Sequence, residues 1–282
     1  MICSEIKVSI FSITYNHEKY ISHAIESFLM QKTNFKFEIV IADDASTDNN
    51  QSIIKDYNQQ YPEIINPILR EKNVGMNFNF SEGIKKCKGK YIALCEGDDY
   101  WTDPYKLQKQ VDFLESHPDC SLTCHSVGVE MFGSDQIESR QIIIKDKYLT
   151  NTEIITYHGK ITPTLSYVFK SSMIKKLPNW VTKAPVGDIP LAFFLMMHGN
   201  VYCFSDMMGV YRSNVPGSWS TRKIKRINRF KYRVKYNAFI QEFNKYSKHK
   251  YSNELNIHRR KRNFLSFLLI ELSSFIYRSF KY

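Results

Sequence analysis

The stretch of this chain with the strongest chemical character is YIALCEGDDYW, which begins at Tyr91. An apolar run of strand length, Tyr91 to Cys95, ends there in three acids, Glu96, Asp98 and Asp99. Ligands of α/β proteins bind beyond the carboxyl ends of the strands, and carboxylates placed there can hold a divalent cation that also contacts phosphate oxygens. Adjacent acids before aromatic residues are also typical of a polar turn that caps a helix. The rest of the chain favours the metal interpretation.

Two other apolar runs also end in polar residues. Thr14, Tyr15 and Asn16 follow the first run, and Asp43 and Asp44 follow the second. Parallel strands place these ends on one edge of the sheet, so the side chains can converge on one ligand. A carboxylate there can accept the ring N–H of uracil while other acids hold a cation on a pyrophosphate. The segment DDASTD fits a turn and helix cap equally well when taken alone.

The elements that must position these residues alternate between strand and helix signals, as in a doubly wound α/β sheet. We expect strands at 7–13, 37–42, 65–70, 91–95 and 121–132, and helices at 20–30, 51–61, 77–86 and 105–116. Residues 133–160 are expected to form a variable loop or edge strand, residues 161–170 a strand and residues 189–197 a helix. The glycine patterns G-x-G-x-x-G and G-x-x-x-x-G-K-[ST] are both missing, so neither a dinucleotide fold nor a P-loop is supported.

Composition limits the class of protein. The 282 residues fit one large domain or a domain with an appendage, and 43% hydrophobic residues suffice for a sizeable core. The first residues carry Glu5 and Lys7 and show no leader peptide, and no apolar run reaches the roughly 18 residues of a membrane span. The six cysteines lack C-x-x-C spacing, so we expect reduced core thiols and a cytoplasmic protein.

Positive charge is concentrated at the C-terminal end. Residues 222–282 carry 17 Lys and Arg against three Glu, a net charge of +14 within a total of +11. Aromatic and aliphatic residues are interspersed with these charges, so residues 221–282 are expected to form a basic amphipathic helical tail. Such helices bind anionic membrane surfaces. Two alternatives remain. The tail could bind nucleic acid, or it could simply pack on the catalytic domain as part of the fold.

Five segments occur in a characteristic order: SIFSITYNHEKYI, EIVIADDASTDN, NVG, GKYIALCEGDDYW and VGDIPLAFFLMMHG. In this order they resemble the motifs of family 2 glycosyltransferases with the GT-A fold, from about Lys7 to about Trp219. The resemblance implies a Rossmann-like mixed sheet at residues 1–220, with a nucleotide-sugar-binding half (1–120) and an acceptor half (121–220). It also implies inverting transfer of a sugar from a nucleotide diphosphate donor with Mn²⁺ or Mg²⁺.

The resemblance assigns expected roles to the polar strand ends. Thr14, Tyr15 and Asn16 occupy the first-strand loop, which lines the nucleoside in this family, and Asp44 falls where the family's uracil-contacting carboxylate lies. Asp98 and Asp99 match the D-x-D-like element, with Glu96 in place of its leading acid. Asp99 is the expected direct metal ligand, and Asp98 reaches the ribose, the metal or a metal-bound water.

The later motifs supply the remaining candidates. Asp188 in GDIP matches the acid that serves as catalytic base, although Gly187 stands where the family usually has a second acid. Asp188 could also cap the helix that follows it. Arg212 lies in a segment resembling the one that closes over the donor and could meet the diphosphate, or could form a surface ion pair.

The sequence thus predicts an inverting glycosyltransferase that moves a sugar, most simply from UDP, to a glycan or lipid-linked acceptor in surface polysaccharide synthesis. It is expected at the inner face of the cell membrane, with no nucleic-acid partner. One alternative is a sugar nucleotidyltransferase, but its Gly-rich, Arg-containing loop is missing after the first strand. Another is a non-catalytic binding protein with a degenerate transferase fold, against which Asp44, Asp98, Asp99 and Asp188 all argue.

Overall fold

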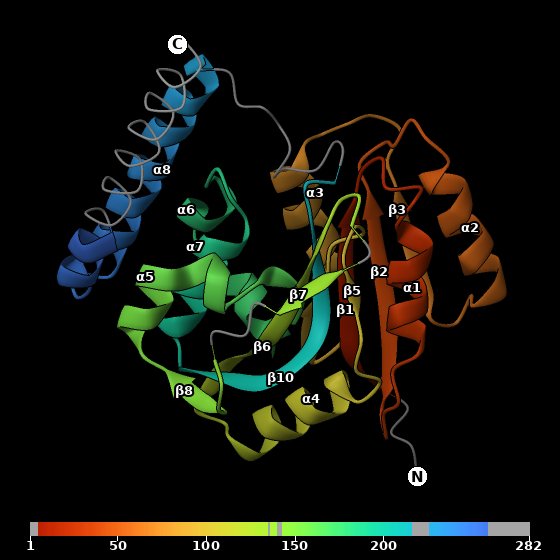
Figure 1. The fold of residues 1–282 in the computed structure, drawn as a ribbon, viewed down its shortest axis with the longest axis horizontal. Helices are drawn as coiled ribbons and strands as arrows, with labels where there is room; N and C mark the ends of the chain where they lie inside the picture. Colours follow the sequence, from red (N-terminus) through yellow and green to blue (C-terminus); the bar gives the residue numbers. More distant parts are fainter. Residues whose placement is uncertain (1–4, 135, 140–142, 216–225, 259–282) are drawn as a thin grey trace, which may run out of the picture.

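The computed structural model describes residues 5–134, 136–139, 143–215 and 226–258 (Figure 1). Its strands are β1 (Ile6–Thr14), β2 (Lys36–Asp43), β3 (Ile65–Leu69), β4 (Tyr91–Leu94), β5 (Tyr100–Trp101), β6 (Cys120–Met131), β7 (Ile137–Ser139), β8 (Lys147–Leu149), β9 (Val168–Lys170) and β10 (Asn200–Ser213). Its α-helices are α1 (Ile21–Leu29), α2 (Asn50–Gln60), α3 (Met76–Gly83), α4 (Lys106–Ser116), α5 (Asn151–Ile161), α6 (Asn179–Thr182), α7 (Asp188–Met196) and α8 (Arg226–Tyr246). Short 3₁₀ helices occupy Ile84–Lys86, Thr164–Ser166 and Ser171–Lys176.

The strands form one mixed sheet in the order β3-β2-β1-β4-β9-β6-β10-β5, with β7 paired to β6 and β8 to β10. The pairs β1–β2, β1–β4, β2–β3 and β6–β10 are parallel, whereas β9 runs antiparallel to both β4 and β6. This confirms the predicted α/β class with a mixed, doubly wound sheet. Parallel pairing aligns Thr14 with Asp43, which brings the polar ends of β1 and β2 to the same edge.

Helices cover both faces of the sheet because successive strand residues alternate between them. Ile10 of β1, like Ile39 and Ile41 of β2, packs in a core with α1, α2 and α4. Phe11 and the intervening residues of β2 face the opposite core, which includes α5 and α7. The alternating apolar residues of β1 and β2 thus fill two cores, one on each face of the sheet.

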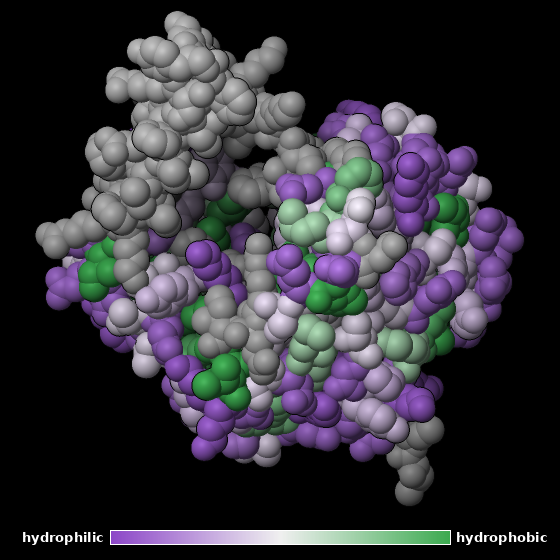
Figure 2. Space-filling view, viewed as in Figure 1, coloured by the Kyte–Doolittle hydropathy of each residue, from purple (hydrophilic) through white to green (hydrophobic). Residues whose placement is uncertain are grey.

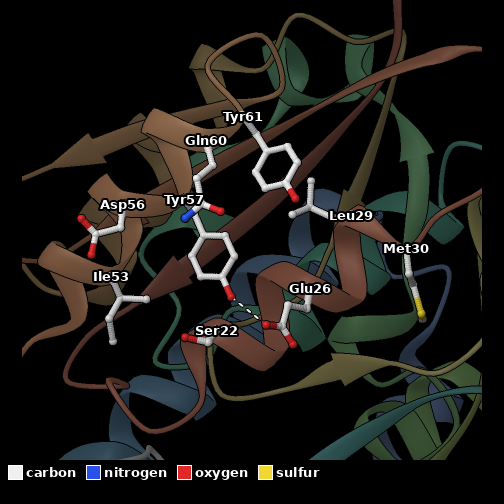
Figure 3. Close-up of a pocket in the computed structure, with 9 residues that line it drawn as sticks. All are labelled: Ser22, Glu26, Leu29, Met30, Ile53, Asp56, Tyr57, Gln60 and Tyr61. Carbon is white, nitrogen blue, oxygen red and sulfur yellow. Dashed lines mark hydrogen bonds between the residues drawn. The ribbon is translucent and has the colours of Figure 1, made fainter.

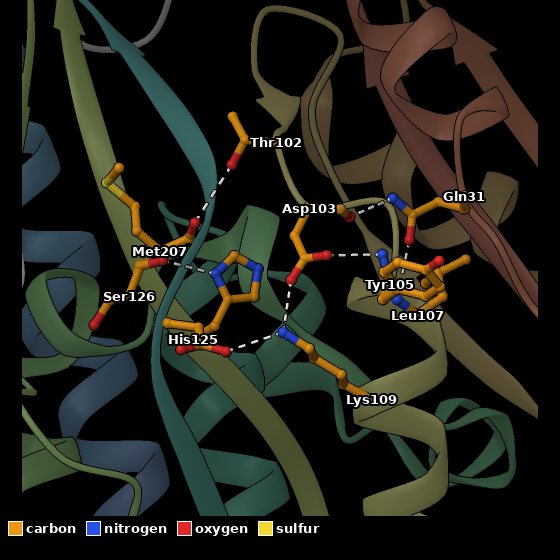
Figure 4. A network of polar contacts seen from close by, with 10 residues as sticks. Gln31, Thr102, Asp103, Tyr105, Leu107, Lys109, His125, Ser126 and Met207 are labelled. Atoms are coloured by element: carbon orange, nitrogen blue, oxygen red, sulfur yellow. Dashed lines mark hydrogen bonds and ion pairs between the residues drawn. The ribbon is translucent and has the colours of Figure 1, made fainter.

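The segment that follows the acid turn is anchored by hydrogen bonds at the start of α4 (Figure 4). Asp103 accepts a bond from the backbone N–H of Tyr105 at 2.8 Å and an ion pair from Lys109 at 2.8 Å. Gln31, after α1, donates to the carbonyl of Asp103 and accepts from the N–H of Leu107. These bonds satisfy backbone groups at the helix start and tie it to α1.

The basic C-terminal segment is part of the fold as far as the structure describes it. Phe239 and Phe243 of α8 are buried in the same core as Phe193 of α7, and Tyr251 and Leu255 beyond α8 join them. Packing on the body, the structural alternative, is therefore observed for residues 232–258. The apolar run from Phe264 to Ile276 and the segment around Trp219 lie outside the described residues.

Several expectations for the second half were wrong. Residues 151–161 form helix α5 where a loop or edge strand was expected, and only Val168–Lys170 of the expected strand at 161–170 is a strand. The 14-residue strand β10 was not predicted. Within the described residues, no helix combines the length and hydrophobicity needed to cross a bilayer. On the face drawn in Figure 2, the described hydrophobic side chains form separate areas among polar ones.

Candidate active site

The turn that carries the three acids is held against the end of β1. The N–H groups of Cys95 and Gly97 donate to the carbonyls of Phe11 and Ile13, at 3.3 and 3.0 Å. Gly97 lies so close to β1 that a Cβ atom built there would be 2.7 Å from the hydroxyl oxygen of Thr14. Real Cβ contacts are never this short, so only glycine lets the acids reach this position.

The ends of β1 and β2 are fastened to each other. The N–H of Asp44 donates to the carbonyl of Thr14 at 3.0 Å. The amide of Asn50 donates to the hydroxyl of Thr14 at 3.1 Å and to the Asp43 carboxylate at 2.8 Å. Thr14, Asp43 and Asp44 are all at most 4% exposed. Asp43 also receives the Ser46 hydroxyl, so its carboxylate is fully engaged in holding this loop.

Asn16 joins the loop after β1 to the loop after β2. Its φ of 57° lies in the left-handed region, which asparagine tolerates better than most residues. Its N–H donates to the Ser46 hydroxyl at 2.9 Å, and its side-chain oxygen accepts the N–H of Thr47 at 2.8 Å. Tyr15 lies beside it, partly buried. The loop at the nucleoside end of the predicted site is therefore rigidly built.

The Asp44 carboxylate organises the NVG segment. One oxygen accepts the N–H of Val74 at 2.8 Å and the other accepts the N–H of Gly75 at 2.9 Å. The side chain of Asn73 donates to the Asp44 carbonyl at 3.0 Å. Since each carboxylate oxygen has two lone pairs, Asp44 can still accept a ligand N–H.

Burial and mutual repulsion dominate the electrostatics of the acid turn. Asp99 is 2% exposed, and this burial together with the charges of Asp98 and Glu96 raises its pKa well above the usual range. Burial and the Asp98 charge likewise raise the pKa of Glu96 to about 8. The three acids therefore repel one another in a buried place with too little positive charge nearby. A divalent cation bound there would reduce this repulsion.

Arg212 of β10 holds this turn through hydrogen bonds to Asp98 and Asp99. The backbone N–H of Arg212 donates to the Asp99 carboxylate at 2.8 Å, and the guanidinium donates to the backbone carbonyl of Asp98 at 3.2 Å. The same guanidinium lies 3.3 Å from the Glu130 carboxylate and contacts His23 at 2.6 Å. Its side chain is only 8% exposed and that of Glu130 is 29% exposed, so the ion pair is partly buried.

Asp188 arrives at the acid turn from a distant part of the chain. It is the first residue of α7 and is partly buried, with Gly187 at the N-cap position. Its charge contributes to raising the pKa of both Glu96 and Tyr167, so it lies close to these two groups. No side-chain capping bond is made at the N-cap, although an acid in the first turn still favours the helix dipole.

Some residues near the acids were not identified from the sequence. His17 lies 3.7 Å from the Asp98 carboxylate, and Thr164 is close enough to Glu96 to lower the pKa of that acid. His17 follows the Thr14-Tyr15-Asn16 loop directly, so its proximity could have been noticed. Thr164 could not, because nothing local links it to β4. In the described part of the chain, no three His, Cys, Asp or Glu side chains already converge as metal ligands.

The site lies apart from the groove between α1 and α2, a hollow of about 680 Å³ (Figure 3). Its lining includes Tyr57, whose hydroxyl donates to Glu26 at 2.8 Å, and the exposed Tyr61. None of the predicted site residues lines it. His125 of β6 is fully buried, and its Nδ1 atom lies at hydrogen-bond distance, 2.8 Å, from the Ser126 carbonyl.

Comparisons with known sequences agree on one family. A family model described as glycosyl transferase family 2 matches residues 9–174. Rv1520 of Mycobacterium tuberculosis is 36% identical over 222 residues, 75% of this chain and 60% of that protein. The chain thus spans less than two thirds of that relative's length. The putative teichuronic acid biosynthesis glycosyltransferase TuaG of Bacillus subtilis is 27% identical over 158 residues, 56% of this chain and 58% of that protein.

Solved structures support the fold. TarS 1–349 of S. aureus in complex with UDP-GlcNAc aligns with a TM-score of 0.61 at 18% identity, covering 88% of this chain and 73% of that one. The mannosyltransferase PcManGT of Pyrobaculum calidifontis, in complex with GDP-Man and Mn²⁺, aligns with a TM-score of 0.58 at 16% identity, covering 84% and 64%. At such identities the likeness confirms the predicted GT-A-like architecture and nothing more specific.

Proposed function

Because the chain belongs to glycosyl transferase family 2, we propose that it transfers a sugar from a UDP-sugar to a glycan or lipid-linked acceptor, with inversion at the anomeric carbon. The observation that carries this proposal is that Asp188 is near enough to the acid turn for its charge to help raise the pKa of Glu96. Asp188 is about ninety residues away in sequence, yet its charge acts directly on Glu96. Carboxylates from separate elements that raise one another's pKa are a common feature of functional sites.

A divalent cation, Mn²⁺ or Mg²⁺, fits the acid turn. Such ions are held by one or two carboxylates together with substrate phosphate oxygens, so Asp99 and Asp98 suffice as protein ligands. The raised pKa of Asp99 supports this assignment, because the buried carboxylate is short of positive charge. When bound, the cation would stabilise the charge that develops on the departing nucleotide diphosphate.

Asp188 acts as the base in this proposal. An inverting transfer needs one group that takes the proton from the acceptor hydroxyl as that oxygen attacks the anomeric carbon. Asp188 is partly exposed at the start of α7, so an acceptor can reach it. Its charge also helps to raise the pKa of Glu96, which places it near the acid turn. A single carboxylate is enough here, unlike in glycoside hydrolysis, where two flank the bond.

The loops after β1 and β2 form the donor end. Asp44 offers its remaining lone pairs to the ring N–H of a base, beside the Val74 and Gly75 amides that it holds. Thr14, Tyr15 and Asn16 border the nucleoside. Arg212 was predicted to meet the diphosphate; its buried bonds to Asp98, Asp99 and Glu130 favour instead a role in positioning the metal-binding turn.

The acceptor and the location belong to the same proposal. The similarity to TuaG supports a role in surface polysaccharide synthesis, and the +14 charge of residues 222–282 supports contact with an anionic membrane surface. The comparisons do not favour the nucleotidyltransferase alternative, because the family and its relatives are glycosyltransferases.

The test is a donor screen that reads out released nucleotide with Mn²⁺ or Mg²⁺ and a panel of acceptors. UDP release that requires both acceptor and metal, and that disappears in Asp188→Asn, supports the proposal. Asp56→Asn, an exposed acid on α2, is the matched control and should retain activity. Metal-independent turnover, or full activity in Asp188→Asn, would contradict it.

A further inference from the structure

Helix α3 connects the donor end of the site to the loop that carries Asp188, and one side chain makes the connection. The amide of Asn77 donates to the carbonyl of Ala184 at 2.8 Å, across 107 residues of sequence. Ala184 is 2% exposed and lies four residues before Asp188. A buried carbonyl that loses its donor is costly, so this bond defines the path of the loop.

Helix α3 itself is fixed to the donor half, from its N-cap to its middle. Its N-cap, Gly75, has a φ of 87° and donates its N–H to the Asp44 carboxylate. Asn79, one turn on, donates to the Ala42 carbonyl at 2.8 Å and is 1% exposed. Phe80 packs edge-to-face on Phe11 of β1 with ring centroids 5.5 Å apart. Helix α3 therefore moves with β1 and β2.

The loop before Asp188 needs such a support. Residues 183–187 link the short helix α6 to α7, and Gly187 is exposed, with nothing within 4 Å of the place where its Cβ would be. An error of about 1 Å in the position of a reacting group can cost 10²-fold in rate. An amide clamp on Ala184 limits that error.

We propose that Asn77 is a positioning residue that clamps the Asp188 loop to the donor half of the site. The proposal rests on the proposed function for its kinetic consequence but not for its structural one. In this role Asn77 acts through Ala184, whose carbonyl its amide holds. The Asp44-held NVG segment and the base are thereby parts of one rigid unit.

The test compares Asn77→Asp with Asn58→Asp. Aspartate has the shape of asparagine but replaces the donating amide by a carboxylate that repels the carbonyl. Asn58 of α2 is the matched control, since its amide donates to the Ile65 carbonyl at 2.7 Å, away from the site. Hydrogen–deuterium exchange of residues 184–190, measured without nucleotide, should rise about 5-fold in Asn77→Asp and stay at the wild-type rate in the control.

Kinetics give the second measurement. In Asn77→Asp the kcat should fall about 10-fold or more while the donor KM and the Mn²⁺-dependent Kd for UDP stay within about 2-fold. Asn77→Gln keeps an amide donor and should recover much of both the rate and the protection from exchange. It also serves as the test if Asn77→Asp does not fold.

Unchanged exchange of residues 184–190 in Asn77→Asp, or an equal rise in Asn58→Asp, would overturn the clamp. If the wild-type protein transfers no sugar from any donor, the proposed function fails, yet the exchange comparison still decides whether the clamp exists. If transfer is observed and exchange is unaffected, only the clamp fails. The two failures are therefore distinguishable.

Discussion

Gly97 shows why the acid turn tolerates no side chain between its acids. The Cβ of an alanine there would lie 2.7 Å from the hydroxyl oxygen and 2.8 Å from the Cβ of Thr14. Gly97→Ala should therefore push Asp98 and Asp99 away from β1 and reduce transfer by at least about 10²-fold. Gly187→Ala is the control, because a Cβ there meets nothing within 4 Å and φ is −90°. Equal activity of both variants would show that the turn is less constrained than this contact indicates.

Asp99 is the acid whose burial most directly indicates a cation. Asp99→Asn should abolish Mn²⁺-dependent UDP binding, since a neutral amide is a poor ligand for a hard cation. It should also stabilise the metal-free protein, because a buried and repelled carboxylate is removed. Calorimetry with and without Mn²⁺ measures the first effect and thermal unfolding the second. Unchanged Mn²⁺-dependent UDP binding would remove Asp99 from the metal site.

At the residue scale, strand-end acids were predictable and their partners were not. Asp44, Asp98 and Asp99 directly follow apolar strands, and the carboxyl ends of parallel strands lie at one edge of a sheet, a general rule that needs no knowledge of the strand order. The surroundings of Arg212 depend on β5 pairing antiparallel with β10, over a hundred residues away. The guanidinium lies against Glu130 because β10 also pairs with β6, where Arg212 is the register partner of Glu130, and no local pattern indicates this.

At the element scale, helix α4 contains an unusual buried lysine. Lys106 is 0% exposed, its ammonium lies 3.9 Å from the Trp101 ring centroid, and its Nζ has no hydrogen-bond partner among the residues that the structure describes. Burial lowers the pKa of Lys106 from 10.5 to about 7. Read from the sequence, a lysine at the start of an amphipathic helix would be placed on the surface.

This lysine predicts a pH dependence of stability. Between pH 7 and 9 the unfolded chain binds the Lys106 proton and the folded protein loses it, so folding stability rises with pH in that window. Lys106→Met should remove that rise and increase the stability most at pH 7 and below. Denaturant unfolding of both proteins at pH 6, 7, 8 and 9, without metal, gives the difference curve. If the difference in the free energy of unfolding between the two proteins did not change with pH, the lowered pKa of Lys106 would be contradicted.

The elements themselves were predicted best where strand and helix alternate. From β1 to β6 the predicted ranges match the observed strands and helices to within a residue or two at most ends, because each carries a clear period. The prediction failed at α5 and β10. Residues 200–213 have no uniform period: the pairing of β10 with β6 has three register shifts, and β10 is exposed at Asp206 and Met207.

At the scale of the whole molecule, the basic C-terminal segment belongs to the body as far as residue 258. Phe243 is 0% exposed and its ring lies 5.4 Å from Trp180, 4.9 Å from Phe193 and 5.7 Å from Tyr251. Charge alone could not reveal this, because the buried stripe of α8 is interleaved with lysines and arginines.

Phe243→Ala should therefore destabilise the entire protein, by about 3–5 kcal/mol. Val234→Ala on the exposed side of the same helix, 52% exposed, should change the free energy of unfolding by less than about 0.5 kcal/mol. Chemical denaturation followed by tryptophan fluorescence measures both. A Phe243→Ala protein as stable as wild type would show α8 to be a separable appendage.

The central claim is that Asp188 and the acid turn form one catalytic site, and steady-state kinetics of Asp188→Asn test it most directly. The account predicts a fall in kcat of about 10² or more, with the Mn²⁺-dependent Kd for UDP and the melting temperature close to wild type. That combination belongs to a lost base. Normal turnover, or lost stability with proportionally reduced binding, would contradict the claim and leave Asp188 as a structural residue of α7.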